Sequence, residues 1–446
     1  MPLLKVVVVG GGVAGVAAAL AASGRGAQTT LIDSSNRIGL SRALMPFLIS
    51  EGWDEDDLIL PQAQSLSKSG VEVRTGMSVD LVLHQEKKIL VSSALAKSEA
   101  DRRSVSIGFD SLVICTGATS QPPHLRGLSK PNVFLLRAPS DYLGLSGALP
   151  SLQNFVVSGP IPLALKLGEI LAAKGKGVRI YCGNGGLSRQ FSEPVAAALR
   201  QQVSARGKDV ALVDESIDGI LGVKKAEAVS SGGSVQTCDG VVVIPKSVPS
   251  FPEVGCDKGR EGGLLVDLSM STSLLGVFAA GDSAEIKFKS GTLAARLHST
   301  SLTGGQVAGL NAAGGRALAA PSWAAEQAYF GFEFCSAGLS KEEALAMGLK
   351  AGSSAGVSAD YRFGESGGPR ETHVSLVYDV ATHQVYGVQV GGWRSSSLSA
   401  AASLIVSAGL TVEQLAHLES PYSPGLSYDA SPIALTAGKI LGLSGS

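Results

Sequence analysis

Residues 5–33 read KVVVVGGGVAGVAAALAASGRGAQTTLID, in the order strand, glycine loop, helix, short turn, strand and acid. Gly10 permits a tight turn, Gly12 lets the backbone approach a pyrophosphate, and Gly15 lets the following helix pack closely on the strand. Asp33 ends the second strand, where a carboxylate can accept hydrogen bonds from the ribose hydroxyls of an adenosine. A bare glycine signature is weak evidence, but this complete context predicts a dinucleotide-binding unit.

The same stretch contains an uncharged run, from Val6 to Gly24, that superficially resembles a signal peptide or a membrane span. Four consecutive valines are followed at once by three glycines. This pattern indicates a buried strand that ends in a turn, because a secretory segment would continue in leucine or alanine. No other segment is apolar over a sufficient length to span a bilayer. We therefore expect neither secretion nor membrane insertion.

The composition is that of a globular chain of two or three domains, with 446 residues, 45% of them hydrophobic. Lys and Arg number 37 against 38 Asp and Glu, and no basic block is present, so a nucleic-acid partner has no support. The five cysteines lie far apart, which excludes a zinc knuckle and a Cys-x-x-Cys redox pair. They fit free, mostly buried thiols in a reducing compartment, and we expect a cytoplasmic protein.

Two later segments narrow the expected ligand of this site from a dinucleotide in general to a flavin. One apolar strand runs into Thr116, Gly117 and Ala118, and a second runs into Gly281 and Asp282. Together with the amino-terminal glycine signature, these motifs resemble the FAD/NAD(P)-dependent disulfide reductase superfamily. The resemblance implies that FAD is bound by these five residues and by those of the first loop, and that Asp282 contacts the ribityl chain.

The carboxy-terminal third of the chain resembles one subgroup of this superfamily. Residues 335–348, 376–392 and 408–427 follow the order seen in the interface domain of coenzyme A disulfide reductases, NADH oxidases and NADH peroxidases. That subgroup implies a homodimer in which this domain lies beside the active site of the partner. The residues agree in part, because 374–392 alternate as two strands around a turn at 379–383, which predicts a hairpin.

These patterns predict an α/β fold with two Rossmann-like dinucleotide-binding domains and a carboxy-terminal α+β interface domain. We assign residues 1–149 and 255–324 to a discontinuous FAD-binding domain. An NAD(P)-binding-like domain is expected at 150–254, and the interface or dimerisation domain at 325–446.

The reactive cysteine of the family has no counterpart in the expected segment. The family pattern is Ser-x-x-x-Cys-Gly-x-Pro-Tyr, whereas residues 40–47 read LSRALMPF, with two residues fewer between Ser41 and Pro46 and no Cys-Gly. Without a thiolate beside the flavin, neither a mixed disulfide nor a sulfenic acid can form. Cys115 or Cys335 near the flavin is an alternative to an inert buried thiol.

The second nucleotide site keeps the strand-helix-strand shape over residues 154–182 but departs from its chemistry. The three positions of the glycine signature hold Gly159, Ile161 and Ala164. We expect the branched isoleucine to obstruct a phosphate, and Pro160 and Pro162 remove two N–H donors from the loop. Cys182 replaces the acid that would meet the ribose. NAD(P)H binding is therefore left open against a lost or repurposed site.

Three residues are candidates for catalysis. Tyr422 stands where the interface domain of the family places a tyrosine that reaches into the active site of the partner, with a buried structural tyrosine as the alternative. His298 follows the second flavin motif and could donate or accept a proton, although packing or a surface position is the ordinary role of a histidine. Arg42 lies beside the missing cysteine and could hold an anionic substrate, or it could be a solvated helix residue.

The leading hypothesis is an FAD-dependent oxidoreductase that acts directly at the flavin on a small molecule, such as a thiol or a carrier-linked substrate. One alternative is an NAD(P)H-dependent flavin reductase or oxidase with an atypical nucleotide loop. Another is a flavin-binding structural or regulatory protein without turnover.

Overall fold

The computed structural model describes residues 3–50, 52–95, 104–288, 291–294, 296–360, 370–421 and 430–443. The chain forms two compact units: Met1–Gln121 with Ser247–Pro321, and Pro122–Lys246 with Ser322–Ser446. The predicted α/β class, with Rossmann-like sheets and a carboxy-terminal α+β domain, is confirmed. None of the helices in the described ranges combines the length and the hydropathy that crossing a membrane requires.

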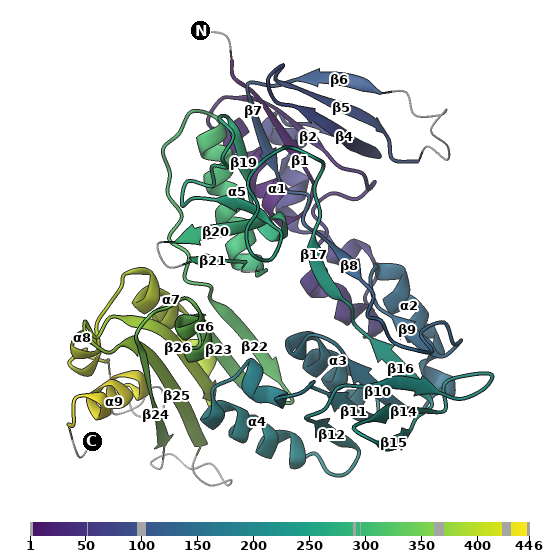
Figure 1. Cartoon of the computed structure of the whole chain (residues 1–446), viewed down its shortest axis with the longest axis vertical. Helices are drawn as coiled ribbons and strands as arrows, with labels where there is room; N and C mark the ends of the chain where they lie inside the picture. Colours follow the sequence, from purple (N-terminus) through teal and green to yellow (C-terminus); the bar gives the residue numbers. More distant parts are fainter. Residues whose placement is uncertain are drawn as a thin grey trace. The chain divides into compact units, whose positions relative to one another are not determined.

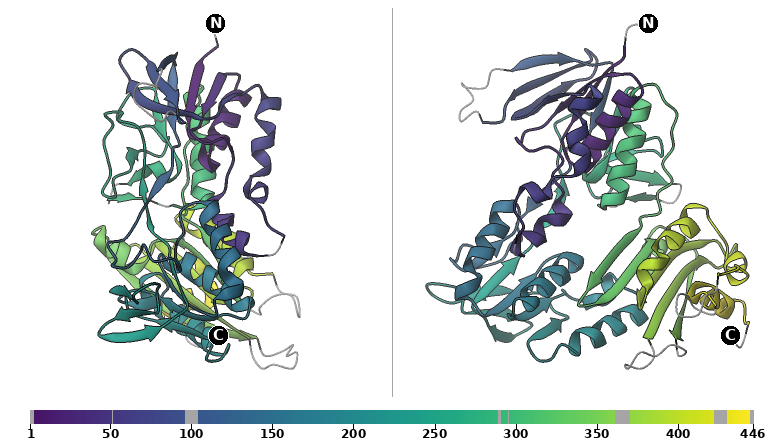
Figure 2. Two further views of the ribbon diagram at one scale, coloured as in Figure 1. Left: turned by 90° about the vertical axis from the view of Figure 1, so that its right-hand side faces the viewer. Right: turned by 180° about the vertical axis from the view of Figure 1, so that it is seen from behind.

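The first unit is built on a five-stranded parallel sheet in the order β19-β7-β1-β2-β3. The strands are β1 (Lys5–Val9), β2 (Gln28–Ile32), β3 (Glu72–Arg74), β7 (Ser111–Ile114) and β19 (Val277–Ala279). The valines of β1 are buried, as the continuous apolar run predicts for a central parallel strand. Helices α1 (Val13–Gly24) and α5 (His298–Ala312) pack side by side against this sheet (Figures 1 and 2).

Three smaller sheets and several 3₁₀ helices complete the first unit. The antiparallel sheet contains β4 (Met77–Leu83), β5 (Lys88–Ser93) and β6 (Val105–Gly108). Another contains β18 (Leu264–Val266), β20 (Ala284–Phe288) and β21 (Gly291–Leu293). The 3₁₀ helices are η1 (Arg42–Ile49), η2 (Asp56–Leu58), η3 (Pro61–Ser65), η4 (Ser67–Ser69) and η8 (Gly281–Ser283). Strand β8 (Ala118–Gln121) pairs with β17 (Lys246–Pro249).

The second unit begins with another parallel sheet, in the order β12-β11-β10-β16-β9. Its strands are β9 (Val133–Leu135), β10 (Asn154–Ser158), β11 (Gly177–Tyr181), β12 (Val210–Val213) and β16 (Gly240–Val243). Its helical segments are α2 (Pro139–Ala148), η6 (Leu149–Ser151), α3 (Ile161–Ala173), η7 (Gly186–Arg189) and α4 (Glu193–Ser204). A meander of β13 (Gly219–Leu221), β14 (Ala228–Ser231) and β15 (Ser234–Thr237) lies beside it. The Rossmann architecture is thus duplicated.

The rest of the second unit is an antiparallel sheet in the order β22-β23-β26-β25-β24. Its strands are β22 (Ala325–Tyr329), β23 (Phe332–Gly338), β24 (Ala351–Asp360), β25 (Arg370–Asp379) and β26 (Val385–Gly392). Helical segments α6 (Lys341–Ala346), η9 (Ser395–Leu398), α7 (Ser399–Ser407), α8 (Val412–Ala416) and α9 (Pro432–Ile440) accompany the sheet. Apolar side chains of β25 and β26 form one core with those of α7, α8 and α9.

The turn between β22 and β23 joins the antiparallel sheet to helices α3 and α4. The N–H of Phe330 donates to Oε1 of Glu169 at 2.7 Å. Its carbonyl oxygen accepts from Nε2 of Gln202 at 3.0 Å and from Nη2 of Arg206 at 2.7 Å. Since Phe330 has φ of +54°, these three bonds hold a backbone conformation that a phenylalanine rarely adopts.

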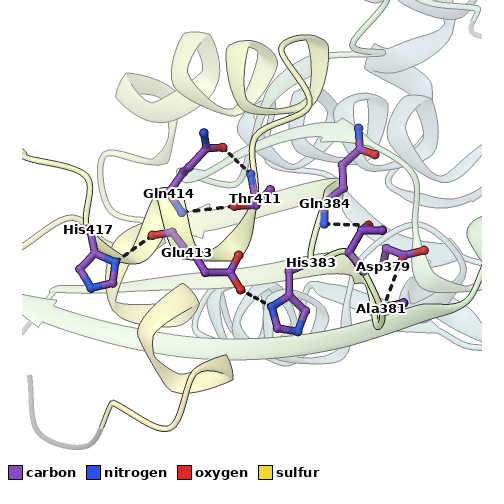
Figure 3. Close-up of polar contacts among 9 residues, drawn as sticks. Asp379, Ala381, His383, Gln384, Thr411, Glu413, Gln414 and His417 are labelled. Carbon is purple, nitrogen blue, oxygen red and sulfur yellow. Dashed lines mark hydrogen bonds and ion pairs between the residues drawn. The ribbon is translucent and has the colours of Figure 1, made fainter.

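The predicted hairpin at 379–383 is confirmed, because β25 and β26 pair antiparallel across it. Figure 3 shows the turn against α8: His383, at φ of +57°, points its Nδ1 at the Glu413 carboxylate, to which it is hydrogen-bonded. Oδ1 of Asp379 accepts from the N–H groups of Ala381 and Thr382 at 2.9 and 2.8 Å. Its Oδ2 accepts from the Tyr386 hydroxyl at 2.7 Å.

These hydrogen bonds predict an acid-dependent contribution of Asp379 to stability. The N–H of Thr382, then the hydroxyl of Tyr386, lower the pKa of Asp379 to about 2. A carboxylate with a lowered pKa stabilises the fold above its unfolded pKa, near 4, and this contribution is lost as the pH falls through about 2. We expect Asp379→Asn to unfold at lower urea concentration at pH 7, with a smaller further loss between pH 4 and pH 2. Tyr386→Phe, which removes one of the three bonds, should be intermediate; parallel curves for all three proteins would contradict the assignment.

Candidate functional site

The glycine loop after β1 combines two packed positions with one open position. Gly10 has φ of +101°, and a Cβ there would lie 2.2 Å from the carbonyl oxygen of Cys115. A Cβ at Gly15 would lie 1.7 Å from the carbonyl oxygen of Gly10. A Cβ at Gly12, in contrast, would meet no atom within 4 Å. The loop is therefore tight where helix and strand meet and open at the amino end of α1, which fits the close approach of a pyrophosphate.

Asp33 lies directly beside this loop. Its Oδ2 accepts from the N–H of Gly11 at 2.5 Å, and its Oδ1 accepts from the N–H of Ser35 at 2.6 Å. The carboxylate is half-buried at the carboxyl end of β2. The structure thus brings the acid that ends the second strand to the first glycine loop, as the adenosine end of a dinucleotide requires.

The second motif forms a turn between β7 and β8 that is fixed to a distant segment. Oγ1 of Thr116 donates to the carbonyl oxygen of Ser250 at 2.5 Å, and the N–H of Ser250 donates to the carbonyl oxygen of Gly117 at 3.0 Å. Gly117 has φ of +74°, and Ala118 is buried as the first residue of β8. These reciprocal bonds hold the Thr-Gly-Ala turn in one conformation.

The third motif lies in a cluster of charges. Gly281, at φ of +74°, and Asp282 form η8, immediately after β19. Burial raises the pKa of the Asp282 carboxyl, and the nearby Arg42 and Arg296 oppose that rise. Nη2 of Arg296 also forms an ion pair with Oε2 of Glu261 at 3.1 Å. Two predicted residues, Arg42 and Asp282, are therefore brought together, whereas Arg296 and Glu261 were missed.

The segment expected to hold a reactive cysteine is a short 3₁₀ helix. Met45 and Pro46 are buried in η1, and Arg42 is exposed at its first position. All five cysteines are free and buried, as the sequence predicts. Burial raises the pKa of Cys115, Cys182 and Cys335 to about 12 and that of Cys238 to about 11, and it also raises the pKa of Cys256. Thiols in such surroundings carry little thiolate at neutral pH.

His298 lines a pocket in the first unit. It is the exposed first residue of α5, and the pocket has a volume of about 300 Å³. The pocket lies among α1, η3 and α5, and its walls are mostly aliphatic: Val13, Val16, Ala17, Leu20, Ala21, Leu60, Gln62, His298, Leu302 and Gln306. These lining residues include no Asp, Glu, Lys or Arg. Tyr422, the third candidate, lies outside the described residues.

Sequence reasoning also missed the glycines that bring α5 onto α1. A Cβ at Gly305 would lie 2.2 Å from the carbonyl oxygen of Ala14, and one at Gly309 would lie 2.1 Å from that of Ala18. The available signal was a matching spacing of four residues on both helices. These contacts run the two helices in the same direction and place the middle of α5 against the start of α1, beside the first glycine loop.

The second glycine loop differs from the prediction at one position. Ile161, at the start of α3, is only 8% exposed. The expectation that it obstructs a phosphate is therefore not supported by the geometry. Pro160 and Pro162 lie at the start of α3, where the lack of their N–H groups leaves fewer hydrogen-bond donors for a phosphate. Cys182, at the carboxyl end of β11, is buried.

Comparisons with known proteins agree over nearly the whole chain. A family model described as pyridine nucleotide-disulphide oxidoreductase matches residues 4–301, and the dimerisation-domain model of the same name matches residues 324–428. An NAD(P)H coenzyme A polysulfide/persulfide reductase from Pyrococcus horikoshii is 25% identical, over 97% of each chain. An NADH oxidase from Methanocaldococcus jannaschii is 24% identical, over 97% of this chain and 98% of the relative.

Solved structures share the fold. The NADH-bound water-forming NADH oxidase of Lactobacillus brevis has a TM-score of 0.86 at 19% identity, with 98% of each chain covered. An engineered NADPH oxidase derived from it, bound to NADPH, gives the same values. An NAD-dependent persulfide reductase from A. fulgidus has a TM-score of 0.86 at 21% identity, over 98% of this chain and 83% of the other.

Proposed function

Because the chain belongs to the pyridine nucleotide-disulphide oxidoreductase family, a family of FAD- and NAD(P)H-binding oxidoreductases, we propose that it reacts with a small-molecule substrate directly at FAD, without a redox-active cysteine. The main support for the proposal comes from the residues of the segment near Asp282. Arg42 occupies it, and no cysteine is present between Ser41 and Pro46. The buried, weakly acidic thiols elsewhere support the same conclusion.

The cofactor site is formed by residues of the first unit. FAD supplies a carrier of two electrons when it is bound. The residues that would hold it are Gly10, Gly12, Gly15, Asp33, Thr116, Gly117, Ala118, Gly281 and Asp282. In this assignment the open backbone at Gly12 receives the pyrophosphate, and the carboxylates at the ends of β2 and β19 accept hydrogen bonds from hydroxyl groups.

Arg42 and His298 are assigned to the substrate. The Arg42 guanidinium, beside Asp282, would attract an anionic group such as a thiolate or a carboxylate. The pocket next to His298 would take an uncharged aliphatic part of a thiol or carrier-linked substrate, because seven of its ten lining residues are aliphatic. The named activities of the relatives, polysulfide or persulfide reduction and NADH oxidation, give the substrates to test first.

A homodimer and a cytoplasmic location belong to the same proposal. The match to a dimerisation domain supports the dimer. Five free cysteines support a reducing compartment.

The proposal is tested by measuring how many electrons the protein takes up per bound FAD. We expect anaerobic titration with dithionite to bleach the flavin fully with one two-electron equivalent per FAD, because no protein sulfur takes up a further pair. Cys115→Ala and Cys335→Ala holoenzymes should keep this stoichiometry and turn over within about threefold of the parent protein. Consumption of two equivalents per FAD, or loss of turnover in one variant with its flavin retained, would show that a cysteine takes part.

A second candidate function is favoured by the second Rossmann sheet: an NAD(P)H-dependent flavin reductase or oxidase with an atypical loop. Ile161 is buried, so its side chain presents less surface to a bound phosphate than the sequence predicts. Five substitutions were made in the engineered NADPH oxidase. They include an aspartate to alanine exchange, an alanine to arginine exchange directly after it and, seven positions after the aspartate, a proline to arginine exchange. This chain has Cys182 and, with the same spacing, Arg189. The parallel supports a nicotinamide nucleotide as the electron donor.

A further inference from the structure

We propose that the second Rossmann sheet selects NADPH over NADH, and that Arg189 contacts the 2′-phosphate; this inference rests on the second candidate function. The residue at the carboxyl end of the second strand of such a unit reads the adenosine ribose. A carboxylate there accepts from the 2′-hydroxyl of NADH, and it would repel the 2′-phosphate of NADPH. β11 is followed instead by Cys182, which is 2% exposed and uncharged at neutral pH.

Arg189 lies along the loop that follows Cys182. Gly183 and Gly185 have φ of +79° and +89°, values that favour glycine. A Cβ at Gly183 would lie 3.2 Å from Nη1 of Arg189, and a Cβ at Gly185 would lie 3.2 Å from its Cγ. The exposed arginine therefore extends back over the glycines and places its guanidinium beside the first residue after the ribose-reading position.

The carboxylates around this loop have other partners. Asp214 forms an ion pair with Arg200 at 2.7 Å. Glu215 accepts from the hydroxyl of Ser231 at 2.6 Å, and Glu193 accepts from the hydroxyl of Ser188 at 2.9 Å. Within the described part of the chain, Arg189 makes no ion pair of its own, so its charge remains available to an anion.

The loop itself is held in place. The N–H of Gly183 donates to the carbonyl oxygen of Glu215 at 3.1 Å, and Oδ1 of Asn184 accepts from the N–H of Ser216 at 3.3 Å. A fixed loop reduces the entropy lost when a ligand binds. A guanidinium on such a loop suits a phosphate, because its planar fork can donate two parallel hydrogen bonds.

The prolines at the start of α3 increase the share of nucleotide binding that the 2′-phosphate must provide. Pro160 and Pro162 have no N–H, so the start of α3 offers fewer donors to the pyrophosphate than an ordinary Rossmann loop does. A contact to the 2′-phosphate would then provide a larger share of the binding free energy. NADH, which lacks this group, would be bound weakly.

The test uses calorimetry on the FAD-loaded enzyme, in which the flavin occupies the other adenosine site. The probes are 2′,5′-ADP, which carries the 2′-phosphate, and 5′-AMP, which does not. We expect 2′,5′-ADP to bind at least about tenfold more tightly, as one charge-assisted pair provides. Arg189→Ala should remove this preference by weakening 2′,5′-ADP alone, and anaerobic flavin reduction should lose its preference for NADPH over NADH.

Lys208→Ala is the matched control. Lys208 is an exposed cation of the same domain, but it precedes β12 and so lies at the amino end of the sheet, away from the ligand edge. It should leave both affinities unchanged. Equal binding of the two probes by the parent protein, a preference that survives Arg189→Ala, or binding of neither probe would overturn the inference. Anaerobic flavin reduction tests the second candidate function separately. Equal reduction of the flavin by NADH and NADPH would overturn this inference alone, whereas no reduction by either nucleotide would overturn both.

Discussion

Gly305→Ala is expected to destabilise the first unit by more than about 3 kcal/mol and to yield protein without FAD. The new Cβ would lie 2.2 Å from the carbonyl oxygen of Ala14 and 2.9 Å from its Cα. Both are backbone atoms of α1, which is packed against β1 and cannot move without opening the glycine loop. Relief of the clash must therefore separate the two helices, which form one core with the parallel sheet.

Gly304→Ala provides a matched control on the same helix. Its Cβ would lie 3.4 Å from Sδ of Met270 and 3.6 Å from Cβ of Ala280, which are ordinary contacts. Because alanine is favoured over glycine in a helix by about 1 kcal/mol, this variant should unfold within about 1 kcal/mol of the parent protein. Urea unfolding measures both variants, and flavin absorbance measures their FAD content. Equal midpoints for the two would show that the helix contact is less tight than the structure indicates.

The first βαβ unit was predictable because its signal is local. Residues 5–33 carry their own strand, loop, helix and acid, and each part constrains the next. The packing of α5 on α1 was not predictable, because it joins Gly305 to Ala14, far apart in the sequence. Small residues spaced by four occur on both helices, but only the folded chain shows which pair meets.

For the candidate site, too, the sequence predicts single residues but not which of them lie close together. The motifs located Asp282 and Arg42 separately, but their proximity arises from the sheet order and could not be read from either segment. Arg296 is not predictable as a neighbour of Asp282, because nothing in its own sequence context distinguishes it. The orientation of Ile161 depends on how α3 is rotated on its sheet, so its obstruction of the loop was inferred from residue type alone, and the structure does not support it.

Asp282→Ala is expected to weaken FAD binding by about ten- to a hundredfold. In the proposed cofactor site, the carboxylate accepts a hydrogen bond from the flavin, and bonds to charged groups contribute about 1.5–3 kcal/mol. The change also leaves Arg42 and Arg296 without the carboxylate that they face. The measurement is the dissociation constant of FAD, from titration of the apoprotein. Asp80→Ala, which removes an exposed carboxylate from β4 in the same unit, should bind FAD as the parent protein does.

Asp282→Asn separates cofactor binding from folding. Burial raises the pKa of the Asp282 carboxyl in the folded apoprotein, so its ionised form is disfavoured there. The relative stability that this group provides is complete below its unfolded pKa and is lost as the pH rises through the raised value. At neutral pH the amide removes that penalty, so the apoprotein of Asp282→Asn should unfold at higher urea concentration than the parent apoprotein. The same variant should bind FAD more weakly, since an amide is a poorer acceptor than a carboxylate. If Asp282 served the fold alone, a more stable apoprotein would also bind FAD more tightly. A rise in both the urea midpoint and the FAD affinity of Asp282→Asn would therefore remove Asp282 from the proposed flavin site.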